Sequence, residues 1–248
     1  SGMVNLSDIA NEKLQKFRST AYLKSKTAYA RYFAAQIFPD VSRCVYLDTD
    51  LLVMRDLSEI AKLDLGENLI AACPHISVRS GNARVDLETR LGINDFRKYF
   101  NSGVLVLDLD HWRREDVVQK IIDLSIEKRD ILHSQDQDAL NIYFEGKTLL
   151  LDVSWNTSQY EKPLPINGYI IHLIGTIKPW HVEYHKKFVE SYYKDVIYKT
   201  FYEILDRTAF RGERPWNWRG LGKLTELARR KTPTLDMIVG RLRRGLNR

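Results

Sequence analysis

One stretch decides the predicted fold: Cys44-Val45-Tyr46-Leu47-Asp48-Thr49-Asp50-Leu51-Leu52-Val53. Its first half is a short apolar run of strand-favouring residues, and the run ends in two carboxylates, Asp48 and Asp50, one residue apart. A buried strand that ends in this way carries acids at its carboxyl end, where alternate side chains share a face. The spacing therefore predicts a site for a hard divalent cation, Mn²⁺ or Mg²⁺.

An isolated Asp-x-Asp is more often a turn with two solvated acids, because the motif is so short. Apolar residues flank Asp48 and Asp50 on both sides, and burying carboxylates without a cation or hydrogen bonds is costly. A metal held there could neutralise a diphosphate leaving group. The flanking residues thus favour a metal site over a solvated turn.

The composition is that of a globular protein. The chain has 248 residues, 44% hydrophobic and 28% charged, which suits one large α/β domain. No run approaches the roughly 18 apolar residues of a membrane span, and the polar start predicts no signal peptide. Cys44 and Cys73 lie in apolar runs, which indicates buried, reduced thiols and a cytoplasmic chain.

The net charge of +6 is unevenly distributed. Residues 207–248 hold 12 Lys and Arg against 3 Asp and Glu, whereas residues 1–206 hold 26 against 29. A nucleic-acid binder usually carries its basic patch on the folded domain, so this distribution argues against nucleic acid as a partner. We expect a catalytic domain over residues 1–206 and a basic tail over residues 207–248.

Helical and strand-like segments alternate along the catalytic region. Helices are expected over residues 7–38, 58–63, 110–129 and 139–144, and strands over residues 45–47, 68–73, 103–107, 148–153 and 169–174. Residues 75–95 are polar and suit a loop with a helix in its second half. The alternation predicts a doubly wound, mostly parallel sheet that binds ligands at the carboxyl ends of its strands.

Two later segments carry polar residues suited to a sugar. Asn101 can offer its amide to a hydroxyl group, and Gly103 lets another group approach the backbone closely, although a plain turn explains both. Residues 133–141 read His-Ser-Gln-Asp-Gln-Asp-Ala-Leu-Asn ahead of an apolar helical rhythm. Helix capping explains one of these acids, whereas a pocket for several sugar hydroxyls explains the whole set.

The last segment surrounds His172, which ends an apolar strand. Gly175 permits a tight turn after it, and Lys178 is a point charge suited to phosphate. A lone histidine here would more often be a core residue. In a chain that also holds Asp-x-Asp, we expect an imidazole metal ligand followed by a phosphate-binding lysine.

Together these motifs resemble glycosyltransferase family 8, and within it the bacterial lipopolysaccharide galactosyl- and glucosyltransferases. The resemblance is carried, in the family's order and spacing, by residues 27–31, 47–50, 100–104, 136–141 and 172–180. It implies a nucleotide-sugar-binding fold of the glycosyltransferase A type. It also implies a UDP-hexose donor, galactose or glucose, a lipopolysaccharide or other glycan acceptor, Mn²⁺, and retention of anomeric configuration.

Roles carry over by position. The resemblance makes Asp48, Asp50 and His172 the metal ligands, and it places the donor and its diphosphate against Arg31, Asp48, Thr49, Asn101, Gly175 and Lys178. The catalytic set would be Asp136, Gln137 and Asp138, with Gln137 near the anomeric carbon. Because an amide is a poor nucleophile, we favour same-face attack guided by the leaving phosphate, with Asp138 as the remaining candidate nucleophile.

The chain departs from the family at two points. The resemblance implies that family members usually begin with a strand that holds the uridine of the donor, and we expect the sequence shown to start after that strand. His75 stands where related galactosyltransferases tend to have an acid near the acceptor. The alternatives are a non-catalytic, membrane-tethered module that binds sugar nucleotides or glycans and, less favoured because it needs more ligands, a metal-dependent phosphohydrolase.

The tail combines aromatic residues with cations. Trp216 and Trp218 lie among arginines, and further on apolar residues recur at helical spacing between basic ones: Leu235, Ile238, Val239 and Leu242. Such a segment is typical of the surface of an anionic membrane, although a solvated terminal helix fits equally well. A lipid-linked acceptor would favour the first alternative and peripheral attachment to the inner face of the cell membrane.

Overall fold

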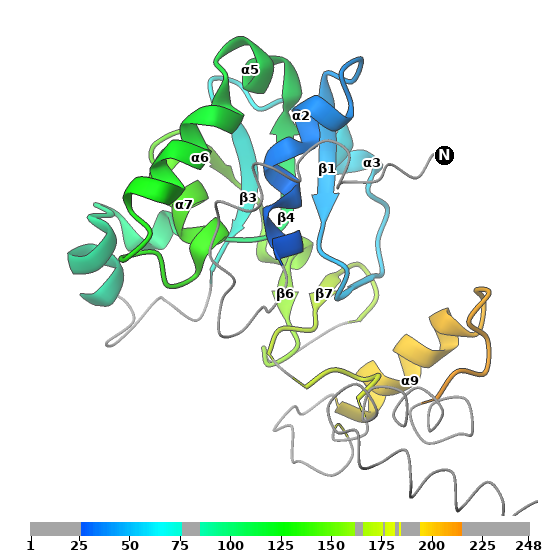
Figure 1. The fold of residues 1–248 in the computed structure, drawn as a ribbon. Helices are drawn as coiled ribbons and strands as arrows, with labels where there is room; N and C mark the ends of the chain where they lie inside the picture. Colours follow the sequence, from blue (N-terminus) through cyan, green and yellow to red (C-terminus); the bar gives the residue numbers. More distant parts are fainter. Residues whose placement is uncertain are drawn as a thin grey trace, which may run out of the picture. The chain divides into compact units, whose positions relative to one another are not determined.

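A computed structural model describes residues 26–75, 85–161, 166–175, 177–181, 184 and 194–214. The chain divides into two compact units, one of residues 1–158 and 165–172 and one of residues 159–164 and 173–248 (Figure 1). Most of the basic tail lies outside the described residues. The expected boundary between residues 206 and 207 therefore stays a prediction, as does a helix over residues 7–25.

The larger unit alternates strands and helices, as predicted. It begins with η1 (Lys26–Phe33), α2 (Ala34–Ile37), β1 (Arg43–Leu47), β2 (Leu51–Val53), α3 (Ser58–Ala61) and β3 (Ile70–Pro74). After β3 come η3 (Leu87–Leu91), η4 (Phe96–Lys98), β4 (Phe100–Asp108), α5 (Leu109–Arg114), α6 (Val117–Glu127) and α7 (Gln135–Tyr143). The unit ends with β5 (Thr148–Leu150), η5 (Val153–Trp155), β6 (Thr157–Ser158) and β7 (Ile170–His172).

The helices differ in detail from their predicted extents. The segment expected over residues 110–129 is two helices, α5 and α6, because Asp116 between them has a left-handed φ of 48° that interrupts the hydrogen-bond ladder. Residues 26–33 form a 3₁₀-helix instead of an α-helix. Helix α7 begins at Gln135, four residues before its predicted start, so that the acids of residues 136 and 138 lie in its first turn.

The strands form two sheets with mixed strand directions. The order β1-β4-β3-β5 makes a four-stranded sheet, and β2-β7-β6 makes a three-stranded one. Among the described strands, β3–β5 and β6–β7 are parallel, whereas β1–β4, β3–β4 and β2–β7 are antiparallel. The α/β class is as predicted, but the described pairing is less parallel than expected. The sequence pattern reports which faces of a strand are buried, and it carries no information on direction.

Alternate residues of β3 and β4 supply two cores. Ile70, Ala72, Leu105 and Leu107 join the cluster that includes α5, α6 and α7, which cover this face (Figure 1). The residues between them, Ala71, Cys73, Val104 and Val106, join a second cluster with Ile60 and Trp155. Burial on both faces explains why these strands are continuous apolar runs. The two central strands are thereby a rigid base for the loops at their ends.

The smaller unit contains α9 (Lys194–Leu205). Aromatic rings join this helix to the segment after β7, and Trp180 and Phe201 have ring centroids 5.3 Å apart. The hydroxyl of Tyr202 donates to the carbonyl of Pro179 at 3.1 Å. Among the helices that the structure describes, none has both the length and the apolar character needed to cross a membrane.

Candidate metal and donor site

The two aspartates lie in the turn that joins the two sheets of the larger unit. Strand β1 of the four-stranded sheet ends just before Asp48, and β2 of the three-stranded sheet begins just after Asp50. The backbone N–H of Asp48 donates to the carbonyl of Gly103 at 2.8 Å, which extends the β1–β4 ladder into the turn. His172 ends β7 and lies opposite Leu51 of β2. Strand pairing thus brings His172 beside the two carboxylates.

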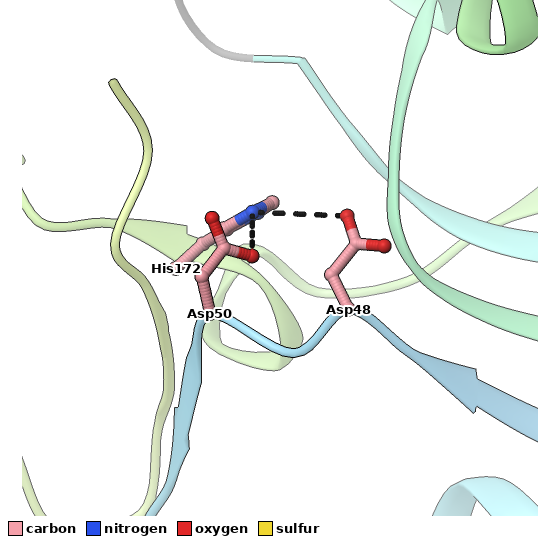
Figure 2. A group of neighbouring side chains, drawn as sticks. All are labelled: Asp48, Asp50 and His172. Atoms are coloured by element: carbon pink, nitrogen blue, oxygen red, sulfur yellow. Dashed lines mark ion pairs between the residues drawn. The ribbon is translucent and has the colours of Figure 1, made fainter. Parts of the chain in front are cut away.

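These three side chains converge, as the sequence predicts (Figure 2). His172 Nε2 lies 3.3 Å from Asp50 Oδ1 and 3.9 Å from Asp48 Oδ2. One nitrogen or oxygen atom from each of the three lies within 4.8 Å of the others. Two carboxylate oxygens and an imidazole nitrogen are a donor set that fits Mn²⁺ or Mg²⁺, and a cation would relieve the repulsion between the two acids.

The carboxylate of Asp48 is held from its other side. Its Oδ1 accepts hydrogen bonds from the hydroxyl of Tyr46 at 2.8 Å and from Arg31 Nη2 at 2.9 Å. The guanidinium of Arg31 also lies 4.5 Å from the centre of the Tyr46 ring. Both donors therefore leave Oδ2 directed toward His172. Tyr46 was not singled out from the sequence, although its position two residues before Asp48 places both on one strand face.

Arg31 links this carboxylate to the start of α7. Its side chain is only 4% exposed, and its Nε lies 3.3 Å from Asp136 Oδ2. Burial raises the pKa of Asp136 to about 6, and the positive charge of Arg31 opposes that shift. Burial alone would lower the pKa of Arg31, and the charges of Asp136 and Asp48 raise it above its ordinary value. Arg31 is thus a fixed cation between two acids.

The first turn of α7 places Gln137 against the start of β4. Gln137 Oε1 accepts from the backbone N–H of Ser102 at 3.1 Å, and Nε2 donates to the hydroxyl of Tyr99 at 3.0 Å. Asn101 lies next to Ser102, so the structure brings Asn101, Asp136 and Gln137 to the end of the sheet that holds Asp48. This clustering agrees with the expected donor contacts, which stay predictions.

Asp138 has different surroundings. It is fully buried, and its carboxylate accepts from Tyr99 at 2.5 Å, from Arg90 Nη1 at 3.0 Å and from the backbone N–H of Ser134 at 2.9 Å. These contacts hold both oxygens inside the protein, and Arg90 was not found from the sequence because it lies 48 residues away. The arrangement favours a positioning role for Asp138 over a nucleophilic one.

Gly103 lies directly against the imidazole of His172. A Cβ atom at this position would lie 2.4 Å from His172 Cε1 and 2.7 Å from Nδ1, closer than real Cβ contacts. The prediction that Gly103 allows a close approach is therefore confirmed, and the approaching group is a candidate metal ligand. No residue with a side chain would leave His172 in this place.

The other predicted residues lie farther along the chain or at the surface. Thr49 is exposed in the turn between the two acids. Gly175 has a left-handed φ of 95°, which favours glycine, and Lys178 Nζ donates to the carbonyl of Leu173. Both belong to the smaller unit, so their contacts with a diphosphate stay a prediction. His75 follows β3, and burial lowers its pKa.

The chain is similar to known proteins in sequence and in fold. The family model of glycosyl transferase family 8 matches residues 3–183. A lipopolysaccharide 1,2-glucosyltransferase of Escherichia coli K12 is 30% identical over 211 residues, which cover 76% of this chain and 61% of that enzyme. A probable glycosyl transferase of Streptococcus gordonii is 32% identical over 189 residues, which cover 73% of this chain and 25% of that protein.

Among solved structures, the galactosyltransferase LgtC in complex with donor and acceptor sugar analogues is similar, with a TM-score of 0.65 and 26% identity. The match covers 88% of this chain and 77% of that one. By contrast, this chain spans less than two thirds of the length of both curated relatives.

Proposed function

This chain belongs to glycosyltransferase family 8, and we propose that it transfers galactose or glucose from a UDP-sugar, with retention, to a lipopolysaccharide or other cell-surface glycan. The observation that carries the proposal is the convergence of two carboxylates and one imidazole within 4.8 Å. Beside them lies the buried Arg31–Asp136 pair. A glycan-binding module without catalysis has no need for this set of metal ligands.

Asp48, Asp50 and His172 would hold the divalent cation. When bound, the cation supplies positive charge that stabilises the departing UDP. The negative charge on the diphosphate grows in the transition state, so the cation stabilises that state selectively. Tyr46 and Arg31 fix the carboxylate of Asp48 in advance, so that little reorganisation accompanies the reaction. We assign to Lys178 a second positive charge on the diphosphate.

The donor sugar would lie between Asn101, Arg31 and the first turn of α7. Gln137 has one side-chain amide with both ends hydrogen-bonded, to Ser102 and Tyr99, which would keep it in place beside the anomeric carbon. The attacking hydroxyl then approaches on the face that UDP leaves, and the departing phosphate accepts its proton. Both oxygens of the Asp138 carboxylate already accept hydrogen bonds from protein groups, which makes it a poor nucleophile. This supports the same-face route over a covalent intermediate.

A donor panel tests the proposal. We expect UDP release from UDP-galactose or UDP-glucose in the presence of Mn²⁺, loss of that release with EDTA, and recovery when Mn²⁺ is restored. UDP release is measured with a coupled assay, and the product linkage with an acceptor by NMR. A thermal shift with UDP and Mn²⁺ but no turnover of any hexose donor would support the binding module instead.

We further propose that the basic tail attaches the protein to the inner, cytoplasmic face of the cell membrane. Changing Arg241, Arg243 and Arg244 to glutamine should weaken binding to anionic vesicles by on the order of a hundredfold, because each cation contributes about 1 kcal/mol near such a surface. Co-sedimentation at low and high salt measures the effect. The matched control changes three exposed lysines of the larger unit, Lys62, Lys120 and Lys147. Equal loss in both triple variants would disprove a specific role of the tail.

A further inference from the structure

We propose that Asn156 is a positioning residue of the metal site. It holds His172 in the tautomer that carries hydrogen on Nδ1, so that the lone pair of Nε2 faces Asp48 and Asp50. The inference rests on the proposed metal-dependent function and adds a residue to it. Asn156 lies between η5 and β6, and only 7% of it is exposed.

The orientation of Asn101 is fixed by a group that cannot be reversed. The backbone N–H of Gly103 donates to the side-chain oxygen of Asn101 at 2.9 Å. A backbone N–H only donates, so the atom that faces it must be the amide oxygen. The same oxygen lies 2.8 Å from Asn156 Nδ2. The nitrogen of the Asn156 side chain is therefore the atom that faces Asn101.

That orientation determines the tautomer of the histidine. With its nitrogen toward Asn101, Asn156 presents its oxygen to His172 Nδ1 at a distance of 3.0 Å. An amide oxygen only accepts, so Nδ1 must carry a hydrogen. A neutral imidazole has one N–H, and Nε2 is then left with its lone pair. Nε2 is the nitrogen that lies near both carboxylates.

Two further features keep this arrangement in place. His172 is 6% exposed, so few waters compete for its Nδ1 hydrogen. The face of Gly103 that lacks a side chain packs against Cε1 and Nδ1 of the ring. Gly103 thus contributes both the space for the imidazole and the N–H that starts the hydrogen-bond series. A ring held on two sides presents one nitrogen to a cation without rotating.

The same series explains how Asn101 would meet the donor. Its oxygen is occupied by two donors, Gly103 and Asn156. Within the described residues its NH₂ group donates to no protein atom. The group that Asn101 can offer to a sugar is therefore a hydrogen-bond donor, which suits a hydroxyl or phosphate oxygen.

Long-range ¹H–¹⁵N NMR of the metal-free chain at a pH where histidine is neutral reads the tautomer directly. His172 is assigned from the signal lost in His172→Gln. We expect hydrogen on Nδ1 and none on Nε2 in the wild type, and a mixture of tautomers in Asn156→Ala. Hydrogen on Nε2 in the wild type, or an unchanged pattern in the variant, would overturn the proposal.

The matched control is Thr157→Val. Thr157 is the next residue and is 4% exposed, and the change removes its partly buried hydrogen bond to the carbonyl of Val153. Thr157→Val should lower the stability of the protein to a degree similar to Asn156→Ala and leave the His172 tautomer unchanged. If Thr157→Val disturbs the tautomer as strongly as Asn156→Ala, the effect belongs to general destabilisation and Asn156 has no specific role.

Calorimetric titration with Mn²⁺ alone gives the second readout. Asn156→Ala should raise the Kd by about 10- to 100-fold, as expected for loss of a partner behind a metal ligand, and Thr157→Val should not. Gly103→Ala should raise it as well, because its new methyl group displaces the ring. An unchanged Kd in Asn156→Ala would contradict the proposal.

The experiments distinguish failure of the proposed transferase function from failure of the proposed role of Asn156. The NMR measurement uses the metal-free protein and depends on no donor sugar. If the wild type releases no UDP from any donor but shows the expected tautomer, the proposed transferase function fails and the role of Asn156 in orienting His172 stands. If the wild type releases UDP but does not show the expected tautomer, the transferase function stands and the proposed role of Asn156 fails.

Discussion

Replacing Asp50 with alanine is expected to reduce Mn²⁺-dependent hydrolysis of the UDP-sugar by on the order of a thousandfold, with a parallel loss of Mn²⁺ affinity. Asp50 Oδ1 lies 3.3 Å from His172 Nε2 and is one of only two carboxylates in the converging set. A metal contributes several kcal/mol of charge stabilisation in such reactions, and each 1.4 kcal/mol corresponds to about a factor of ten in rate.

The same variant should keep its fold. Asp50 is 23% exposed on its side chain, so its removal leaves no large buried cavity. We therefore expect a Tm in EDTA close to that of the wild type. Glu67→Ala, which removes an exposed acid outside the site, is the control for both measurements. Full hydrolysis by Asp50→Ala would refute the metal assignment.

Changing Arg31 to glutamine should lower the free energy of unfolding by about 3–5 kcal/mol, because a buried ion pair loses one partner. Arg31 is 4% exposed and lies between Asp48 and Asp136. Asp136 is 8% exposed and its Oδ2 accepts no hydrogen bond from the described residues, so it would be left as an uncompensated buried charge. Urea denaturation measures the loss.

The loss should grow as the pH rises. The folded-state pKa of Asp136, about 6, lies above the ordinary value of 3.8, so this group favours the folded state when protonated and loses that contribution as the pH rises through 6. Removing Arg31, which opposes the shift, raises the pKa further. The deficit should therefore be larger at pH 8 than at pH 5.

A double variant separates charge from packing. Arg31→Gln combined with Asp136→Asn should recover much of the stability lost at pH 8, since no buried carboxylate is left to ionise. Asp136→Asn alone serves as the reference. An equal deficit at pH 5 and pH 8, or a double variant no more stable than Arg31→Gln, would show that Asp136 is not the origin of the effect.

Much of the fold could be predicted because its central strands are buried on both faces. The runs at residues 68–73 and 103–107 became β3 and β4, and the predicted glycosyltransferase A-type class is confirmed by the likeness to LgtC. Strand direction could not be predicted, because an apolar run is the same in either direction. The interruption at Asp116 also escaped prediction, since nothing in its local pattern demands a positive φ.

Some residues of the site could likewise be predicted from the sequence, and others could not. Asp48, Asp50 and His172 could be found from the sequence because each terminates or directly borders an apolar strand. Asn156 could not, because its role depends on hydrogen bonds to residues 16 and 55 positions away, and these require the paired register of two sheets. Arg90 and Tyr99 escaped for the same reason, since both act through Asp138.

The position of the two aspartates at the junction of two sheets has a consequence for local unfolding. Asp48 follows the last residue of β1, whereas Asp50 precedes β2 and His172 ends β7. A bound cation would therefore be coordinated by side chains from both sheets. Any opening that separates the three-stranded sheet from its neighbour must then release the metal. The affinity for the cation and the resistance of β2, β6 and β7 to amide hydrogen exchange are thereby linked, and tighter binding should slow exchange in these strands.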